Sequence, residues 1–335
     1  MTRQTDNSFL HEIEQKTLQD SSNAELIKAT ALELQNKGFL AILSRLAVHL
    51  CKRNINLIKG RVLVQTSPSA AYSFQETLDH ARLYASEFEK AEIPKNRYCI
   101  KIMATGPGLN AARILQDEGI STLCTGVFSV AQAVACSQAG CLYISPYYNE
   151  IRTHLNPELW PDVQDPALEH PFSHRIAQMV QAYKTLFAAT GKNQPLIKNA
   201  GFRSYKEVLA SAELGCHSAT ISQDLLEELK TMTPGKTPLP VTPKVAAMKS
   251  PYAGDVLIPS PRLGELLSRN LDEEGGRSAK DLTVDLLADG GKALDRALEK
   301  DSEAARMVKE ALDMFIFCEE ETKKLIKGTA LVASL

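Results

Sequence analysis

The chain has 335 residues, of which 44% are hydrophobic and 23% are charged. These proportions are ordinary for a globular protein, and the length allows one large α/β barrel or two smaller domains. The formal net charge of −2 gives no electrostatic basis for binding nucleic acid or an acidic membrane.

The cysteines and the N-terminus favour a cytoplasmic protein. Seven cysteines are scattered without CxxC pairs, and several lie in apolar runs, which is typical of reduced, buried thiols in a reducing compartment. The first residues are polar and do not read as a signal peptide. The longest apolar stretch, residues 39–50, contains Arg45 and is too short to cross a bilayer.

Apolar periodicity predicts three N-terminal helices, over residues 9–18, 24–35 and 39–52. From residue 55 onward, predicted strands alternate with predicted helices. The strands cover residues 58–65, 98–103, 121–127, 141–145, 195–200 and 218–222. The helices cover residues 72–91, 106–118, 129–139, 173–189, 205–214 and 223–230. Six strand–helix units between residues 55 and 231 are typical of parallel βαβ folds.

The remainder is predicted to consist of two long loops, over residues 146–171 and 231–261, and a helical C-terminal part. The C-terminal helices are expected over residues 262–270, 279–287, 291–300 and 303–327. We treat residues 1–335 as a single domain. Six units could form an open sheet, whereas eight would close a (β/α)8 TIM barrel. The two further strands would have to come from residues 1–23, which are not strand-like.

Residues 106–111 (GPGLNA) formally fit the GxGxxA fingerprint of dinucleotide-binding folds. No acidic residue ends the following strand at Val127, so glycines that ease a tight turn explain the segment better. The sequence contains no HExxH, GxSxG, Walker A or zinc-ligand spacing. His154, His170 and His174 are interpreted as solvated loop histidines, and no metal site is predicted.

Polar residues gather where the predicted strands end, and in a barrel these ends share one mouth. They are Gln65, Lys101, Thr105, Thr125, Ser145, Asn199 and Arg203. A lysine among hydroxyl, amide and guanidinium groups suits Schiff-base chemistry on a carbonyl compound, with C–C bond cleavage or formation. Lys198 is a second lysine on an apolar strand, and periodicity alone does not choose between the two.

Over residues 60–222 the chain resembles the transaldolase family. The similar segments are residues 60–62 (GRV, as in a GRVS-type strand), 100–105 (IKIMAT, IKxxxT), 128–133 (FSVAQA, FSxxQA), 145–146 (SP, SPF), 201–204 (GFRS, ASFRN) and 220–222 (TIS, TISP). The resemblance implies a (β/α)8 barrel and class I aldolase chemistry without metal or organic cofactor. It also implies a small carbonyl or sugar substrate and a C-terminal helix that can cover the active-site mouth, and family members are often homodimers.

The resemblance also assigns roles to individual residues. Lys101 matches the Schiff-base lysine, whereas Lys198 falls at an apolar position of the family pattern. Thr125 matches the threonine that holds the catalytic water. The predicted substrate-contacting residues are Ser145, Thr105, Asn199, Glu150 and Arg203, the last of which matches one of two phosphate-binding arginines. Asn23 is the remaining catalytic match, because it corresponds to the asparagine of a TTNP segment, here followed by Ala24.

Several positions depart from the family pattern. The catalytic glutamate falls at Gln65, whose amide can orient a water but cannot transfer its proton. The second phosphate-binding arginine falls at Glu150, which would repel a phosphate. The serine of ASFR becomes Gly201, and an asparagine becomes Leu123. Asp6 is the only candidate by spacing for the first-strand aspartate.

Three functions follow from this combination. The first is an aldolase that keeps the lysine but acts on an altered, unphosphorylated carbonyl compound, with Glu150 meeting an amine or hydroxyl group. The second is a pentose-phosphate transaldolase that transfers dihydroxyacetone between sugar phosphates. The third is a non-catalytic relative that binds a ligand. We expect the first, and we regard the two long loops as candidate lids.

Overall fold

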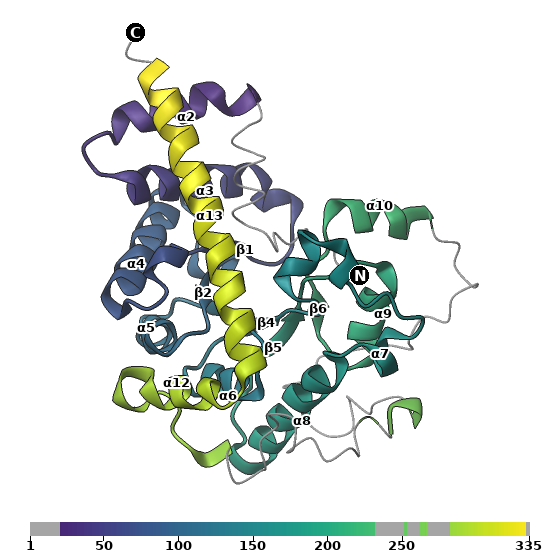
Figure 1. The fold of residues 1–335 in the computed structure, drawn as a ribbon. Helices are drawn as coiled ribbons and strands as arrows, with labels where there is room; N and C mark the ends of the chain where they lie inside the picture. The colour runs from purple at the N-terminus through teal and green to yellow at the C-terminus, as the bar shows by residue number, and fades with distance from the viewer. Residues whose placement is uncertain (1–20, 232–250, 253–260, 265, 267–281, 333–335) are drawn as a thin grey trace.

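The computed structural model describes residues 21–231, 251–252, 261–264, 266 and 282–332. Its centre is a sheet of six parallel strands in the order β1-β2-β3-β4-β5-β6 (Figure 1). The strands are β1 (Val62–Gln65), β2 (Tyr98–Met103), β3 (Thr122–Val127), β4 (Tyr143–Pro146), β5 (Leu196–Asn199) and β6 (Ser218–Ala219). Each strand pairs with the next along the chain, so the predicted βαβ repeat is confirmed.

Helices follow the strands as predicted. They are α3 (Phe39–Asn54) before the sheet, then α4 (Phe74–Lys90), α5 (Gly106–Asp117), α6 (Val130–Gln138), α8 (Ser173–Thr190), α9 (Tyr205–Glu213) and α10 (Gln223–Thr231). Side-chain hydrogen bonds cap the N-termini of several of these helices. In α6, the Ser129 hydroxyl accepts from the Gln132 amide while the Gln132 side chain accepts from the Ser129 amide. This reciprocal cap satisfies donors that a helix N-terminus otherwise leaves free.

In the described part of the chain the sheet is a curled half-barrel of six strands, and the predicted closed eight-stranded barrel is not shown there. Residues 1–20, including the predicted helix 9–18 and Asp6, lie outside the described residues. Ser21–Asn23 form a single 3-10 turn before α2 (Ala24–Glu33). Most of the predicted loop 231–261 and of the predicted helix 262–270 also lies outside them.

The two faces of the sheet differ in chemistry because side chains alternate along each strand. Val64, Ile100, Ile102, Cys124 and Ile144 belong to the main core together with apolar residues of the surrounding helices. Leu63, Cys99 and Leu123 form a separate small cluster on the opposite face, against which Tyr143 packs. We call this second face the inner face, and it also carries the alternate polar residues of the strands.

Two C-terminal helices complete the fold, α12 (Lys292–Glu299) and α13 (Ser302–Val332). Figure 1 shows α13, in yellow, crossing the molecule from α12 to α2, and it contacts β3 on the way. The predicted α-helix 279–287 is wrong over residues 282–287, which are irregular apart from a 3-10 turn at residues 282–283. There, Gln138 of α6 accepts from the Leu286 amide and donates to the Val284 carbonyl, so a distant side chain replaces helical hydrogen bonds.

The predicted loop 146–171 contains short helical segments instead of being irregular throughout. They are η5 (Ile151–His154), η6 (Pro157–Leu159) and α7 (Pro166–Glu169). A buried polar network anchors this segment to α9: Glu207 accepts from Asn149 Nδ2 (2.8 Å) and from Trp160 Nε1 (2.7 Å). His170 Nε2 in turn lies 3.1 Å from Asn149 Oδ1. His170 is thus a buried structural residue, not a solvated one. Within the described residues, no helix is long and apolar enough to span a bilayer.

We expect the stability of the protein to fall as the pH drops from 6.5 toward 4. Burial lowers the pKa of both His170 and His217 to about 4. The unfolded chain therefore binds protons in this range before the folded protein does, and each histidine costs on the order of 2 kcal/mol at pH 5. Urea unfolding between pH 5 and 8 measures the effect. His170→Gln keeps a donor for Asn149 but does not titrate, so it should remove about half of the acid loss; an unchanged pH dependence would contradict the assignment.

We also expect Asp301→Ala to lower the free energy of unfolding by about 3 kcal/mol, since it leaves a buried guanidinium without its main partner. Asp301 accepts from both terminal nitrogens of Arg175 and caps α13 at the Ala304 amide. The matched control is Lys309→Ala, which removes an exposed pair with Asp313 on the same helix and should leave the unfolding midpoint nearly unchanged, because exposed ion pairs contribute little to stability. Equal unfolding midpoints for the two variants would contradict the prediction.

Candidate active site

Polar residues of β1 to β4 meet on the inner face. Strand register pairs Gln65 with Lys101 and Thr125 with Ser145, and paired residues of neighbouring strands project from the same face. Lys101 pairs with Leu123 of the inner cluster, and Met103 pairs with Thr125. All four polar side chains are at most 2% exposed. The structure therefore brings together four of the residues that the sequence singled out.

Lys198 also belongs to the inner face. Register pairs Ile197 with Ile144, so Lys198 is the next residue along from that pair, beside Ser145. Its ammonium lies 5.5 Å from the centre of the Tyr143 ring, and the side chain is 1% exposed. The strand geometry thus presents both lysines to the same interior.

Gln65 is buried at the end of β1 and its Nε2 makes no hydrogen bond. Buried side-chain amides are nearly always hydrogen-bonded to protein or to ordered water. An amide donor that projects from the inner face beside Lys101 is therefore suited to hold a water or a substrate oxygen. It cannot carry a proton, because a carboxamide does not titrate near neutral pH.

Sequence reasoning missed Tyr147, which supplies a titratable group next to Thr125. The Tyr147 hydroxyl lies 3.1 Å from Thr125 Oγ1, and the ring is fully buried. Burial raises the pKa of Tyr147 to about 12, so the phenol is protonated at neutral pH and can donate a hydrogen bond. The available signal was the tyrosine in residues 145–147 (SPY), where the family pattern has SPF.

Gly201 lies against the aromatic ring of Tyr147. Its φ of +74° disfavours any side chain, and a Cβ there would lie 2.9 Å from Cδ1 of the Tyr147 ring. The serine of the family pattern would meet this ring. Glycine at position 201 therefore leaves room for the aromatic ring at position 147.

Two predicted residues are not brought to the inner-face group. Asn199 donates to Ser211 of α9 at 3.1 Å, and its Oδ1 accepts from the Ala200 amide. Asn199 follows Lys198, so the alternation turns it toward the helices. Thr105 caps α5, where its hydroxyl accepts from the Gly108 amide and donates to the Ala71 carbonyl. The contacts of both side chains hold local structure.

Asn23 and Arg203 also lie apart from the strand residues. Asn23 precedes α2 and accepts from Arg53 of α3 at 2.6 Å, and α2 packs on α3 and α13. Arg203 follows β5, and its guanidinium lies 5.7 Å from the centre of the Trp160 ring. The Arg203 amide donates to Glu207 at 2.6 Å, so the buried network of the 146–171 segment also fixes the backbone of Arg203.

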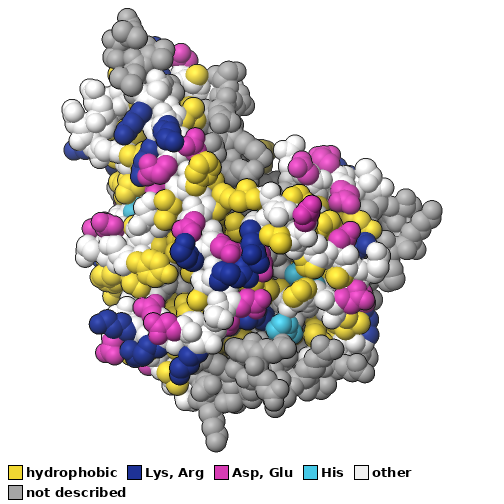
Figure 2. Space-filling view, viewed as in Figure 1, with side chains coloured by type: hydrophobic (Ala, Val, Ile, Leu, Met, Phe, Trp, Pro, Cys, Tyr) yellow, Lys and Arg dark blue, Asp and Glu magenta, His cyan; other side chains and the backbone are white. Residues whose placement is uncertain are grey.

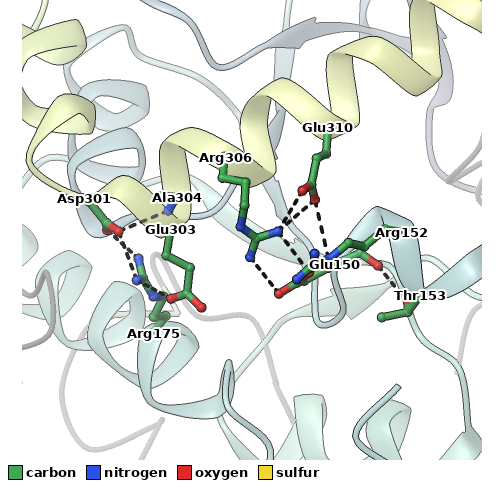
Figure 3. Close-up of polar contacts among 9 residues, drawn as sticks. All are labelled: Glu150, Arg152, Thr153, Arg175, Asp301, Glu303, Ala304, Arg306 and Glu310. Carbon is green, nitrogen blue, oxygen red and sulfur yellow. Dashed lines mark hydrogen bonds and ion pairs between the residues drawn. The ribbon is translucent and has the colours of Figure 1, made fainter. Parts of the chain in front are cut away.

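Glu150 is held by arginines, one of which comes from the C-terminal helix (Figure 3). Arg306 of α13 donates to Glu150 Oε1 at 2.9 Å and also binds Glu310, while Arg152 donates to Glu150 Oε2. Burial raises the pKa of Glu150, but the hydrogen bonds from Arg306 and Arg152 outweigh it and hold the pKa below its usual value. Glu150 is therefore an anion whose charge is already balanced. Figure 2 shows the mixed acidic and basic side chains gathered over α13.

Residues 9–252 match the family model described as transaldolase/fructose-6-phosphate aldolase, and this span covers more than half of the chain. The family consists of aldolase-type and transaldolase-type enzymes whose substrates are small sugars. The match agrees with the resemblance drawn from the short motifs and includes all six strands of the sheet. The chain therefore belongs to the transaldolase/fructose-6-phosphate aldolase family.

Proposed function

We propose that the protein is a class I aldolase that forms a Schiff base between Lys101 and an unphosphorylated ketose or ketone. The observation that carries the proposal is the inner-face group, in which Lys101 and Gln65 neighbour the hydrogen-bonded pair of Thr125 and Tyr147. The group combines a nucleophile, a water-holding amide and a proton donor within one buried interior.

The reaction begins when the Lys101 amine attacks the donor carbonyl, and the adduct loses water to form an iminium ion. The iminium accepts the electron pair of the Cα–Cβ bond while the hydroxyl group on Cβ gives up its proton, so that bond breaks, an aldehyde leaves and an enamine remains. The enamine either adds to an acceptor aldehyde or takes up a proton, and hydrolysis of the resulting imine frees the lysine.

Proton transfer in this scheme falls to Tyr147, with Thr125 holding the water between the phenol and the substrate. Gln65 replaces the family glutamate and orients that water without exchanging a proton. A protonated phenol gives up its proton when negative charge develops on the substrate oxygen, and it recovers the proton in the next step. The 3.1 Å contact with Thr125, in which either hydroxyl can be the donor, keeps the phenol beside the threonine that holds the water.

The charges around Glu150 support a substrate without a phosphate group. Glu150 stands where the family carries an arginine, and it neutralises Arg152 and Arg306. A phosphate would have to displace this carboxylate from both guanidinium groups while being repelled by it. Pentose-phosphate transaldolase activity is the alternative, and Arg203, which matches one of the two phosphate-binding arginines, is the residue that favours it.

The first test is borohydride trapping with two matched variants, Lys101→Met and Lys198→Met. We expect dihydroxyacetone to give a reduced adduct, located by peptide mass at Lys101, in the wild type and in Lys198→Met. Lys101→Met should give none. Fructose 6-phosphate should give far less adduct than the unphosphorylated ketone.

The other outcomes of the trapping experiment are equally informative. An adduct at Lys198 would contradict the choice of nucleophile. Efficient trapping of fructose 6-phosphate would favour a pentose-phosphate transaldolase. The absence of an adduct with a panel of small ketones would favour a non-catalytic relative that binds a ligand.

A second prediction concerns Tyr147→Phe, which removes the phenol and keeps the ring. We expect adduct formation at Lys101 to persist, while the exchange of deuterium from D2O into dihydroxyacetone slows by about 100-fold or more, because general acid–base catalysis typically contributes this much. Tyr148→Phe is the control, since Tyr148 is also buried but bonds to Pro166 and Ser173. Similar exchange rates for the two variants would remove Tyr147 from the mechanism.

A further inference from the structure

Three cysteines meet on the helix side of the sheet, behind the inner face. Cys124 comes from β3, Cys136 from α6, and Cys141 from the turn before β4. Their sulfur atoms all lie within 4.8 Å of one another, and Cys124 Sγ lies 3.2 Å from Cys141 Sγ. Each side chain is at most 4% exposed. We call this cluster the cysteine trio.

The separations fit a single tetrahedral ion. Zinc–thiolate bonds are about 2.3 Å long, so the sulfur atoms of a zinc site lie roughly 3.8 Å apart. The Cys124–Cys141 distance of 3.2 Å is shorter than this value and no distance in the cysteine trio exceeds 4.8 Å, so small side-chain rotations suffice to reach it. Because the three cysteines belong to different elements, no short sequence motif identifies the cluster.

Thr122 provides a second, independent observation. It precedes Cys124 by two residues on β3, so both side chains project toward the helices. Its hydroxyl is fully buried, has no nitrogen or oxygen partner, and lies beside the Cys141 thiol, with which it interacts as a weak hydrogen-bond donor. Since buried hydroxyls are nearly always bonded, this oxygen is suited to be a neutral fourth ligand.

We propose that Cys124, Cys136 and Cys141 bind one zinc ion, with the Thr122 hydroxyl in the fourth position. Binding replaces three thiol protons, which are released, by one Zn²⁺, and the closed site carries one negative charge. Copper(I) on the same three thiolates would bury two negative charges at a greater desolvation cost. A disulfide between Cys124 and Cys141 would leave Cys136 and Thr122 unused.

The location implies a structural role. The cluster joins β3, β4 and α6, and it is enclosed by the main core, so the ion has no open position for a substrate. Metal must therefore bind before the core closes, and binding is coupled to folding. This inference is independent of the proposed aldolase activity.

The test refolds the purified chain from denaturant under reducing conditions with and without zinc, and then removes loosely held metal with a chelator. We expect about one zinc per chain by elemental analysis and a higher thermal unfolding midpoint for the zinc-refolded protein. Cobalt(II) in place of zinc should produce thiolate-to-cobalt absorption in the near ultraviolet. Cys136→Ala should lose all three signals, whereas Cys99→Ala, which removes a buried thiol of the inner face, should keep them.

Three results would overturn the proposal. One is wild-type protein that folds with zinc but retains none. Another is equal metal content in Cys136→Ala and Cys99→Ala. A third is a metal-free protein whose mass and peptide map show a Cys124–Cys141 disulfide after folding under reducing conditions. Metal content and midpoint are measured without any substrate, so these outcomes do not depend on catalysis.

Discussion

The two-residue alternation of side chains along parallel strands is the constraint on which the rest of the protein depends. Because β1 to β4 pair in register, successive residues of each strand project alternately into the helix-packed core and from the inner face. Ile100, Ile102 and Ile144 belong to the core, whereas Gln65, Lys101, Thr125 and Ser145 project from the inner face. A shift by one residue in any strand would exchange the two sets. Burial of the apolar residues in the core fixes the register of each strand, and the register in turn places the polar residues on the inner face.

The chemistry within that interior is adjusted by packing. The Tyr147 ring occupies the space where a side chain at position 201 would lie, and the phenol then reaches Thr125. Gln65 adds a donor that does not titrate, while burial keeps the phenol protonated. The departures from the transaldolase pattern at residues 65 and 147 therefore place a non-titrating amide and a phenol in the same interior. In the proposed mechanism, a phenol with a much higher pKa takes over the proton transfer that a carboxylic acid performs in the family pattern.

Charge balance links this interior to the C-terminal helix. At one end of α13, the buried pair of Arg175 and Asp301 ties the helix to α8, and Glu303 adds a second carboxylate to Arg175. One turn farther on, Arg306 binds Glu150, which follows β4. The two contacts hold α13 against the strand ends by complementary charge (Figure 3). At position 150, a glutamate stands where the family pattern has an arginine that binds substrate phosphate. The same glutamate makes the contact to α13.

The sequence by itself determined the order of strands and helices, the parallel sheet, the family, and the common face of Lys101, Thr125 and Ser145. The family follows from short sequence motifs, and the other features follow from local periodicity, which a strand or helix expresses wherever it lies. The tertiary structure alone decided that Thr105 caps a helix, that Asn199 bonds to α9, and that residues 282–287 are irregular.

The tertiary structure also decided which residues contact Tyr147 and Glu150, and it brought the cysteine trio together. Arg306 follows Glu150 by 156 residues, and Gln138 precedes Leu286 by 148 residues. No local pattern encodes such contacts, because they arise when separately formed elements pack together and their buried polar groups must find partners.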